Sequence, residues 1–497
     1  MIDLAQEIKP APGLVLTDEM QAILDHAPES DLVVEAGAGT GKTTLLTQYA
    51  RKWPKRGLYL SYNAAIAKEA QTRFPANIDA MTAHSYAYRT QNVSRYKSRL
   101  VPRIRRNHIR EANLQLDNPM LSEDRMVKAI MAGIHNFTNS AGTTLTERHC
   151  ELEFAPKQTR DKVMPIIAKA VLQFVKYEES SLPFTHDCYL KNLEMTGSMG
   201  HEYDYILVDE AQDLNPILLS LVQKAQRPVI MVGDRKQSIY AFRGSVDAMA
   251  EIDAPRLPLS QSWRFGGPVD DIANYILSYT DNPPEWKIKG RPNHETKVEL
   301  YEGTAARESL ILARTNVRIF EGLVSTKVPF HVIGGFEAIA VQLMSALALS
   351  KGDRSQIRDS LVMSYRNWDE MVTDAEEDDD DHEVKRIVKI VSDYGDQLVS
   401  IINRLRQLHR AHRGEAAIVL STAHKAKGLE AEHVILLDDF PTPSELEARR
   451  LEHKITAVEY DQEFHLLYVS VTRAILTLKL APQLFDAFER VMLEKVK

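Results

Sequence analysis

The stretch that decides the fold covers residues 31–49 and reads DLVVEAGAGTGKTTLLTQY. Asp31–Glu35 encloses a short apolar run with the length of a buried strand, and Thr44–Tyr49 is typical of a helix. Between them, Ala36–Thr43 is rich in glycine, which lets backbone N–H groups converge on an anion at the start of a helix. The pattern predicts a phosphate-binding loop, with Ala36 where such a loop has its first glycine.

The loop predicts how a nucleotide is held. Lys42 is expected to reach the β- and γ-phosphates of ATP, and Thr43 to hold Mg²⁺. The wider set of expected cofactor-binding residues in the loop is Gly37, Gly39, Thr40, Gly41, Lys42, Thr43 and Thr44. The alternative is a glycine-rich turn that binds nothing, and the strand, the Gly-Lys-Thr sequence and the helix together argue against it.

A second apolar run, Tyr205–Val208, ends in the acids Asp209 and Glu210. Asp209 is expected to coordinate Mg²⁺, and Glu210 to orient and deprotonate the attacking water. A third run, 228–232, is followed by Gly233 and Asp234. Strands that end in functional residues predict a parallel α/β sheet with the ligand at the strand C-termini. The distance in sequence from Lys42 to Asp209 exceeds one βαβ unit and indicates an insertion.

Composition limits the class of protein. The chain has 497 residues, 44% hydrophobic and 26% charged, which excludes a collagen-like or wholly disordered chain. The net charge is -8, and residues 374–383 contain eight acids, so the rest is neutral and any nucleic-acid binding needs local patches. We expect this acidic run to be a mobile solvated loop, with mimicry of DNA as the alternative. Cys150 and Cys188 are expected to be buried neutral thiols.

The N-terminus has acids where a secretory signal peptide has Lys or Arg, and the most apolar stretch, 338–349, is too short to span a bilayer. We therefore expect a cytoplasmic protein, associated with the nucleoid or, in a eukaryote, nuclear.

Further motifs follow in a fixed order along the chain. DEAQD at 209–213 and VGDRKQSIYAFRG at 232–244 resemble superfamily 1 DNA helicases of the UvrD/Rep type. The remaining matching segments are LTDEMQ at 16–21, LSYNAAIA at 60–67, TAHS at 82–85, SQSWRF at 260–265, ARTN at 313–316, GGF at 334–336, TAHKAKGLE at 422–430 and EFHLLYVSVTRA at 463–474. The wording of several motifs, with FTNS at 137–140, is most similar to the F-box DNA helicase branch, here without an F-box.

The resemblance implies an α/β fold of two RecA-like parallel-sheet domains that face an ATP cleft, each with a mainly helical insertion. Its first core domain is expected at 1–88 and 177–255, with insertion 89–176. The second core domain is expected at 256–335 and 414–497, with a small insertion at 336–413 that carries the acidic run.

The resemblance also assigns roles at the nucleotide. Gln21 reads adenine, Trp263 stacks on it, Gln237 links the γ-phosphate to the DNA side, and Glu430 contacts the sugar or a linking water. Arg264 and Arg473 reach the γ-phosphate, a task that suits a permanently charged guanidinium. For each arginine taken alone, the alternative is a surface salt bridge.

For DNA, the resemblance gives stacking or contact residues at Tyr62, His84, Phe242, Arg243, Thr422 and His424. Each aromatic taken alone fits core packing equally well. Seven basic residues and no acids lie at 95–110, and among them Arg103, Arg105 and Arg106 are expected to clamp DNA phosphates. The alternative is a solvated helix face.

The function implied is an ATP-hydrolysing translocase and helicase that moves 3′ to 5′ on single-stranded DNA and opens duplex junctions, as in DNA repair. The alternative is a DNA-stimulated ATPase switch that gates a partner nuclease or another effector in a repair or defence assembly.

Overall fold

The structure is a computed structural model that describes residues 16–61, 63–112, 114, 116, 118–239, 248–305, 308–377 and 382–493. By its internal contacts the chain divides into two compact units. The first comprises Met1–Ala36 and Gly41–Leu259, and the second comprises Ser260–Lys497 together with Gly37–Thr40 of the glycine-rich loop.

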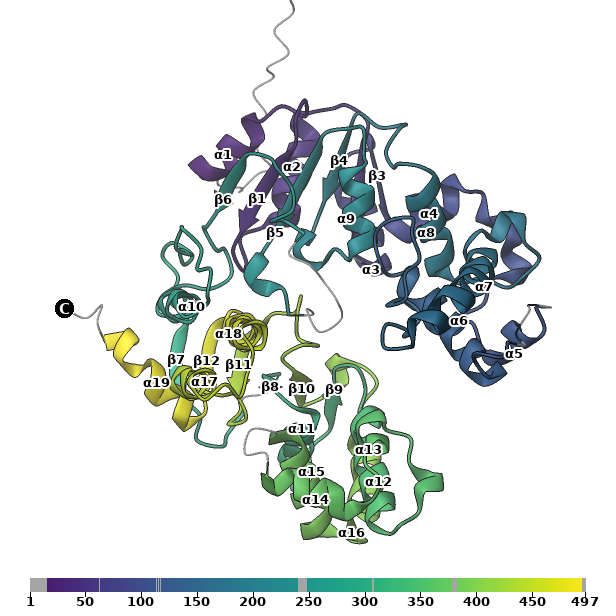
Figure 1. Ribbon diagram of the computed structural model, residues 1–497. Helices are drawn as coiled ribbons and strands as arrows, with labels where there is room; N and C mark the ends of the chain where they lie inside the picture. Colours follow the sequence, from purple (N-terminus) through teal and green to yellow (C-terminus); the bar gives the residue numbers. More distant parts are fainter. Residues whose placement is uncertain are drawn as a thin grey trace, which may run out of the picture. The chain divides into compact units, whose positions relative to one another are not determined.

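The first unit is built on a six-stranded sheet with the order β3-β2-β4-β5-β1-β6, in which every pairing is parallel (Figure 1). Its strands are β1 (Leu32–Ala36), β2 (Gly57–Ser61), β3 (Ile78–Thr82), β4 (Tyr205–Val208), β5 (Val229–Gly233) and β6 (Arg256–Leu259). The runs expected at 31–35, 205–208 and 228–232 therefore form β1, β4 and β5. Because all these strands are parallel, their carboxyl ends lie at one edge of the sheet.

Both faces of this sheet are covered. In β1, Leu32 and Val34 belong to one apolar core, while Val33 between them belongs to another, as expected for side chains that alternate along a strand. The helices of the unit are α1 (Asp18–Asp25), α2 (Lys42–Lys52), α3 (Ala64–Arg73), α4 (Ala83–Thr90), α5 (Arg106–Arg110), α6 (Glu123–Phe137), α7 (Lys157–Val175), α8 (His186–Thr196) and α9 (Pro216–Gln223). Figure 1 shows α5, α6 and α7 gathered beside α8, to one side of the sheet.

The second unit has its own six-stranded parallel sheet, with the order β7-β12-β11-β8-β10-β9. Its strands are β7 (Lys297–Leu300), β8 (Leu310–Ala313), β9 (Phe330–Val332), β10 (Ile418–Thr422), β11 (Ala431–Leu436) and β12 (Ala474–Leu480). Its helices are α10 (Val269–Ser278), α11 (Asn316–Leu323), α12 (Glu337–Ser350), α13 (Ser360–Ser364), α14 (Trp368–Glu377), α15 (His382–Tyr394), α16 (Gln397–Leu408), α17 (Pro443–Leu451), α18 (Ala457–Val471) and α19 (Pro482–Leu493).

The two all-parallel sheets confirm the predicted α/β class. The predicted domain boundaries stay predictions, although α5–α7 fall within 89–176 and α12–α16 within 336–413. None of the described helices combines the length and the apolar character that a membrane crossing requires.

The flanks of the acidic run correct an expectation. Asp374 lies in α14 and accepts a hydrogen bond from the Tyr365 hydroxyl at 2.5 Å, and Glu383 lies in α15 and accepts one from Gln342 Nε2 at 3.0 Å. The prediction of a mobile loop is therefore wrong for these flanks, because acids on a helix are held by packing that a count of charges does not reveal. Residues 378–381 lie outside the described residues.

Both cysteines are buried free thiols, as predicted. Burial raises the pKa of Cys150 to about 12 and that of Cys188 to about 11, so both stay protonated and inert at neutral pH.

Candidate active site

No side chain caps the start of α2. Gly41, the residue before the helix, has a φ of 82° and no side chain to accept from the first N–H groups. Gly39 also has a positive φ, 71°, which favours glycine at both positions. No side chain therefore caps the first turn of α2. That its N–H groups hold the phosphates of a nucleotide stays a prediction.

The Asp209 carboxylate is the centre of the candidate metal site. Its Oδ2 accepts hydrogen bonds from Thr43 Oγ1 at 2.8 Å and from the Tyr59 hydroxyl at 2.7 Å. Burial raises the pKa of Asp209 and neighbouring Glu210 adds to the shift, while Lys42 and the two hydroxyl donors oppose it. A buried carboxylate beside a second acid is a fitting ligand for a divalent cation, which prefers oxygen donors and would relieve the repulsion. Thr43 and Asp209, predicted to hold Mg²⁺, are thus brought together.

Glu210 lies next to Asp209 in a strained backbone conformation, with a φ of 52°. Its N–H donates to Asp209 Oδ1 at 2.9 Å, and its carboxylate is 3.5 Å from Lys42 Nζ. The short segment η3 (Ala211–Asp213) follows directly. The positive φ is stored strain of the kind found at functional sites, and it aims the Glu210 carboxylate toward the phosphate loop lysine.

Gln237 is held at the end of β5, in the segment η4 (Arg235–Gln237). Its Nε2 donates to Asp234 Oδ2 at 2.7 Å, and both residues are almost fully buried. Asp234 N in turn donates to Gln212 Oε1 at 3.0 Å. The ends of β4 and β5 are therefore joined by buried polar bonds, although Gln212 was not among the predicted residues.

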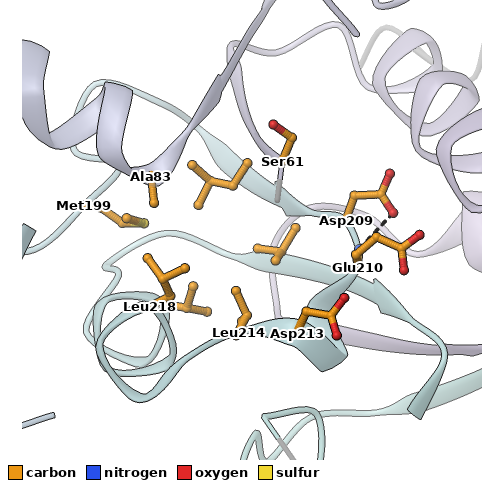
Figure 2. A pocket seen from close by; sticks show the side chains of 11 residues that line it. Ser61, Ala83, Met199, Asp209, Glu210, Asp213, Leu214 and Leu218 are labelled. Atoms are coloured by element: carbon orange, nitrogen blue, oxygen red, sulfur yellow. Dashed lines mark hydrogen bonds between the residues drawn. The ribbon is translucent and has the colours of Figure 1, made fainter. Parts of the chain in front are cut away.

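A small cavity of about 30 Å³ lies behind the acids, lined by Leu60, Ser61, Ala83, Met199, Val208, Asp209, Glu210, Asp213, Leu214, Leu218 and Val222. Figure 2 shows Ala83, Met199, Leu214 and Leu218 gathered on one side, with Asp209, Glu210 and Asp213 on the other. The cavity has room for about one or two water molecules. The three acids therefore form the polar side of a cavity whose other side is apolar.

The nucleotide residues predicted in the second unit lie in two groups. Arg264 Nε donates to Glu430 Oε2 at 2.7 Å, which brings two of them together, and Arg264 Nη1 donates to Thr472 O at 3.1 Å. Arg473 is 1% exposed and donates to the carbonyl oxygens of Val469 and Leu429 at 2.8 and 3.0 Å. These contacts lie in the interior of the unit, and a role for Arg473 at the phosphate stays a prediction.

The remaining predicted nucleotide residues have contacts of their own. Trp263 has a buried indole N–H with no hydrogen-bond partner among the described residues. Gln21 Nε2 donates to Asp25 Oδ1 at 2.8 Å within α1. In the loop, Thr40 Oγ1 donates to Gly37 O at 3.0 Å, and Thr44 Oγ1 lies 3.5 Å from Arg73 Nη2.

The predicted DNA residues are spread over both units. Tyr62, Phe242 and Arg243 lie outside the described residues. His84 is partly exposed at the start of α4, 3.4 Å from Asp187 Oδ1, and Thr422 ends β10, with His424 two residues further on.

Within the basic stretch the structure separates two kinds of arginine. Arg99 donates to the carbonyls of Tyr177 and Leu182, and Arg110 pairs with Glu123 and Asp124, so both support the local fold. Arg103, Arg105 and Arg106 are exposed, as Arg110 is, but no ion pair joins their side chains to another described residue. These three arginines are the ones predicted to contact phosphates.

Sequence reasoning missed two residues that shape the site. Tyr59 and Gln212 contact Asp209 and Glu210 respectively. The signal for Gln212 was present in the DEAQD motif, but its side chain reaches β5, a contact that a motif does not encode. Burial raises the pKa of Tyr59, and Asp209 adds to the shift, so its hydroxyl remains a donor.

The comparisons with known proteins agree with this geometry. The family model of the UvrD/REP helicase N-terminal domain matches residues 16–252. F-box DNA helicase 1 of Gallus gallus is 28% identical over 92% of this chain and 48% of that protein. F-box DNA helicase protein 1 of Schizosaccharomyces pombe is 29% identical over 92% and 56%, and a probable DNA helicase II homolog of Rickettsia conorii is 25% identical over 54% and 45%.

This chain therefore spans about half the length of the curated relatives it matches. The resemblance drawn from the motifs, to UvrD/Rep-type helicases and to their F-box branch, is confirmed.

Proposed function

We propose that this chain is an ATP-driven DNA motor. The proposal starts from the match of residues 16–252 to the UvrD/REP helicase N-terminal domain. The observation that supports this most is the convergence of the loop with the two acids: Lys42 Nζ lies 3.5 Å from the Glu210 carboxylate, and Thr43 Oγ1 donates to Asp209 Oδ2 at 2.8 Å. A phosphate loop beside a strand that ends in two acids is the arrangement that nucleotide hydrolysis requires.

The residues divide the work at the nucleotide. Lys42 and the N–H groups at the start of α2 would hold the phosphates, and Thr43 with Asp209 would hold Mg²⁺. When bound, the metal would neutralise charge that develops on the phosphates. Glu210 orients and deprotonates the attacking water, and Arg264 and Arg473 stabilise the charge of the transition state. Gln21, Trp263 and Glu430 complete the nucleotide contacts, and Gln237 links them to the DNA side.

The motor acts on single-stranded DNA and duplex junctions, moving 3′ to 5′. Support for this direction comes from the motif resemblance alone. Tyr62, His84, Phe242, Arg243, Thr422 and His424 contact the strand, and Arg103, Arg105 and Arg106 contact phosphates. The protein would work where DNA is, in a nucleoid or a nucleus. The comparisons do not favour the alternative of a switch subunit for a partner nuclease.

The test is strand displacement by the purified chain. With ATP and Mg²⁺ it should separate a duplex with a 3′ single-stranded tail, and its ATP hydrolysis should rise sharply with single-stranded DNA. Glu210→Gln should bind ATP and hydrolyse it slowly, because Asp209 survives. Separation of a 5′-tailed duplex alone would contradict the direction, and hydrolysis that is independent of DNA would contradict the motor.

A further inference from the structure

The buried Gln212 side chain connects two strand ends of the first unit. It is 1% exposed and belongs to η3, directly after Glu210. Its Nε2 donates to Glu210 Oε2 at 2.7 Å, and its Oε1 accepts from Asp234 N at 3.0 Å. Both polar ends of one amide are thus used, one on the proposed general base and one on the main chain after β5.

The chemistry of the two neighbours fixes the orientation of this amide. The Asp234 N–H can only donate, and an ionised Glu210 carboxylate can only accept. One orientation of the glutamine satisfies both neighbours, with its oxygen toward Asp234 and its nitrogen toward Glu210. A glutamate at this position keeps the acceptor and loses the donor, and a methionine of similar length loses both.

The backbone around the amide is shaped to admit it. A Cβ added to Gly233, the last residue of β5, would lie 2.5 Å from Gln212 Oε1 and 2.6 Å from Met249 Sδ. A side chain at this position would force the Gln212 amide or Met249 to move, so glycine at the end of β5 allows the amide to reach the main chain in its present position. The bridge is therefore supported by packing as well as by hydrogen bonds.

The bonds continue from Asp234 to a proposed nucleotide contact. Asp234 Oδ2 accepts from Gln237 Nε2 at 2.7 Å, and Gln237 N donates to Asp234 O at 2.8 Å. A shift of Gln237 therefore moves the Asp234 main chain, and with it the acceptor end of Gln212. All four residues, Glu210, Gln212, Asp234 and Gln237, lie in the first unit.

We propose that Gln212 is a positioning residue that holds the Glu210 carboxylate in its hydrolytic conformation and makes that conformation depend on the turn formed by Asp234 and Gln237. This inference rests on the proposed function, in which Glu210 is the general base and hydrolysis responds to DNA. Gln212 itself touches neither nucleotide nor DNA in this scheme. It transmits the state of the β5 turn to the base.

The first experiment removes both bonds with Gln212→Met and measures single-turnover ATP hydrolysis with and without single-stranded DNA, together with the Kd for ATP. Loss of a buried hydrogen bond to a charged group should lower the DNA-stimulated rate roughly 10- to 100-fold. The ratio of stimulated to unstimulated rate should fall, while the Kd for ATP changes little. Gln223→Met, the same substitution in α9, is the control and should behave as the wild type.

The second experiment uses Gln212→Glu, which keeps the acceptor for Asp234 N–H and places a carboxylate against Glu210. Two ionised carboxylates at this distance repel each other, so the residue at 212 would no longer hold Glu210 in place. Gln212→Glu should therefore lower the DNA-stimulated rate at least as far as Gln212→Met does, although glutamate has nearly the size of glutamine. A packing role alone would leave the rate of Gln212→Glu close to that of the wild type.

The outcomes separate this inference from the function on which it rests. If wild-type hydrolysis does not respond to DNA, the motor proposal fails. If wild-type hydrolysis responds and Gln212→Met retains the full response, only the role of Gln212 is overturned. A Gln212→Met variant that loses ATP affinity while its remaining activity responds normally to DNA would likewise overturn it.

Discussion

The two sheets carry similar strand-to-helix connections, and these connections end in opposite ways. In the second unit, β8 leads into α11, whose cap Thr315 is bound through its N–H and its hydroxyl by Asp439 Oδ2, at 2.8 and 3.0 Å. Asp439 Oδ1 accepts from Arg314 N at 3.0 Å. Thr315 Oγ1 accepts from Arg318 N at 3.2 Å, so Thr315 caps α11 and the Asp439 carboxylate holds this cap in place.

In the first unit, β1 leads into α2, where Gly41 provides no covering side chain. The acid of this unit, Asp209, binds the hydroxyls of Thr43 and Tyr59 instead of the loop backbone. The side chain of Thr315 thus caps α11, whereas no side chain caps the start of α2. An anion bound at the start of α2 would take the place that a capping side chain has at α11.

The largest expected effect is the loss of hydrolysis in Lys42→Ala. Removal of the loop lysine should lower kcat at least roughly 1,000-fold without unfolding the first unit, because a side chain at the phosphate loop supports no core. Steady-state hydrolysis and circular dichroism would measure this. Lys52→Ala at the other end of α2, which loses an ion pair with Asp25, is the matched control and should keep its activity. Normal turnover by Lys42→Ala would place the nucleotide elsewhere.

The second effect concerns stability in acid and belongs to the first unit alone. Glu194 is fully buried and is bound by Lys191, Lys224 and Ser220. Burial works against its charge, but Lys224, Ser220 and Lys191 lower the pKa of Glu194 to about 2. A lowered folded pKa gives stability that is present above the unfolded value near 4.5 and is lost as pH falls toward 2.

Glu194→Gln should therefore lower the free energy of unfolding by about 3 kcal/mol at pH 7 and by much less near pH 2. Urea unfolding at a series of pH values would measure this. An equal loss at both pH values would show that packing, rather than the charge, carries the effect.

The third effect compares Asp439 of the second unit with Asp209 of the first. Asp439→Asn places an NH₂ group against backbone donors and should lower the free energy of unfolding of the second unit by about 2 kcal/mol, with ATP affinity unchanged. Three of the four tryptophans, Trp263, Trp286 and Trp368, lie in this unit, so their fluorescence in urea reports its unfolding.

The matched variant is Asp209→Asn, which should lose ATP binding without a lower free energy of unfolding. Burial raises the pKa of Asp209, so the charged form is costly in the folded state, and its removal should leave stability unchanged or raise it. Metal-dependent ATP binding should be lost. Equal destabilisation by both substitutions would erase the proposed difference between the two sheets.

The smallest effect tests the exposed arginines of the basic stretch. When Arg103, Arg105 and Arg106 are replaced by alanine, the slope of log K against log salt should flatten by about 0.7 per lost contact on single strands and about 0.9 on duplex. All DNA sequences should be affected equally, because phosphate contacts carry no base information. Alanine at the exposed lysines Lys287, Lys327 and Lys351 of the second unit is the control. An unchanged slope would identify the arginines as a solvated surface.

The sequence patterns predicted β1, the phosphate loop, β4 and β5, because each is a short local run with a strong physical signature. They also paired Thr43 with Asp209 across a long insertion, since both sit at strand ends that share one edge of a parallel sheet. They did not predict Gln212, because its proposed role depends on how closely the main chain of β5 approaches the Gln212 amide at Gly233.

Two further features lay beyond the sequence for related reasons. The sequence does not distinguish Asp439 from other acids that follow a strand. Its bonds to Arg314 and Thr315 form because β8 and β11 are neighbours in the sheet. Asp374 and Glu383 were expected in a loop because their neighbours are acidic, although helix packing decides their structure.

The most direct test of the difference between the two sheets is the stoichiometry of nucleotide binding. Equilibrium titration with a non-hydrolysable ATP analogue and Mg²⁺ should give one site per chain in the wild type and in Asp439→Asn, and that site should be lost in Lys42→Ala. A second site, or a site that survives Lys42→Ala, would contradict the account that only the uncovered start of α2 binds nucleotide.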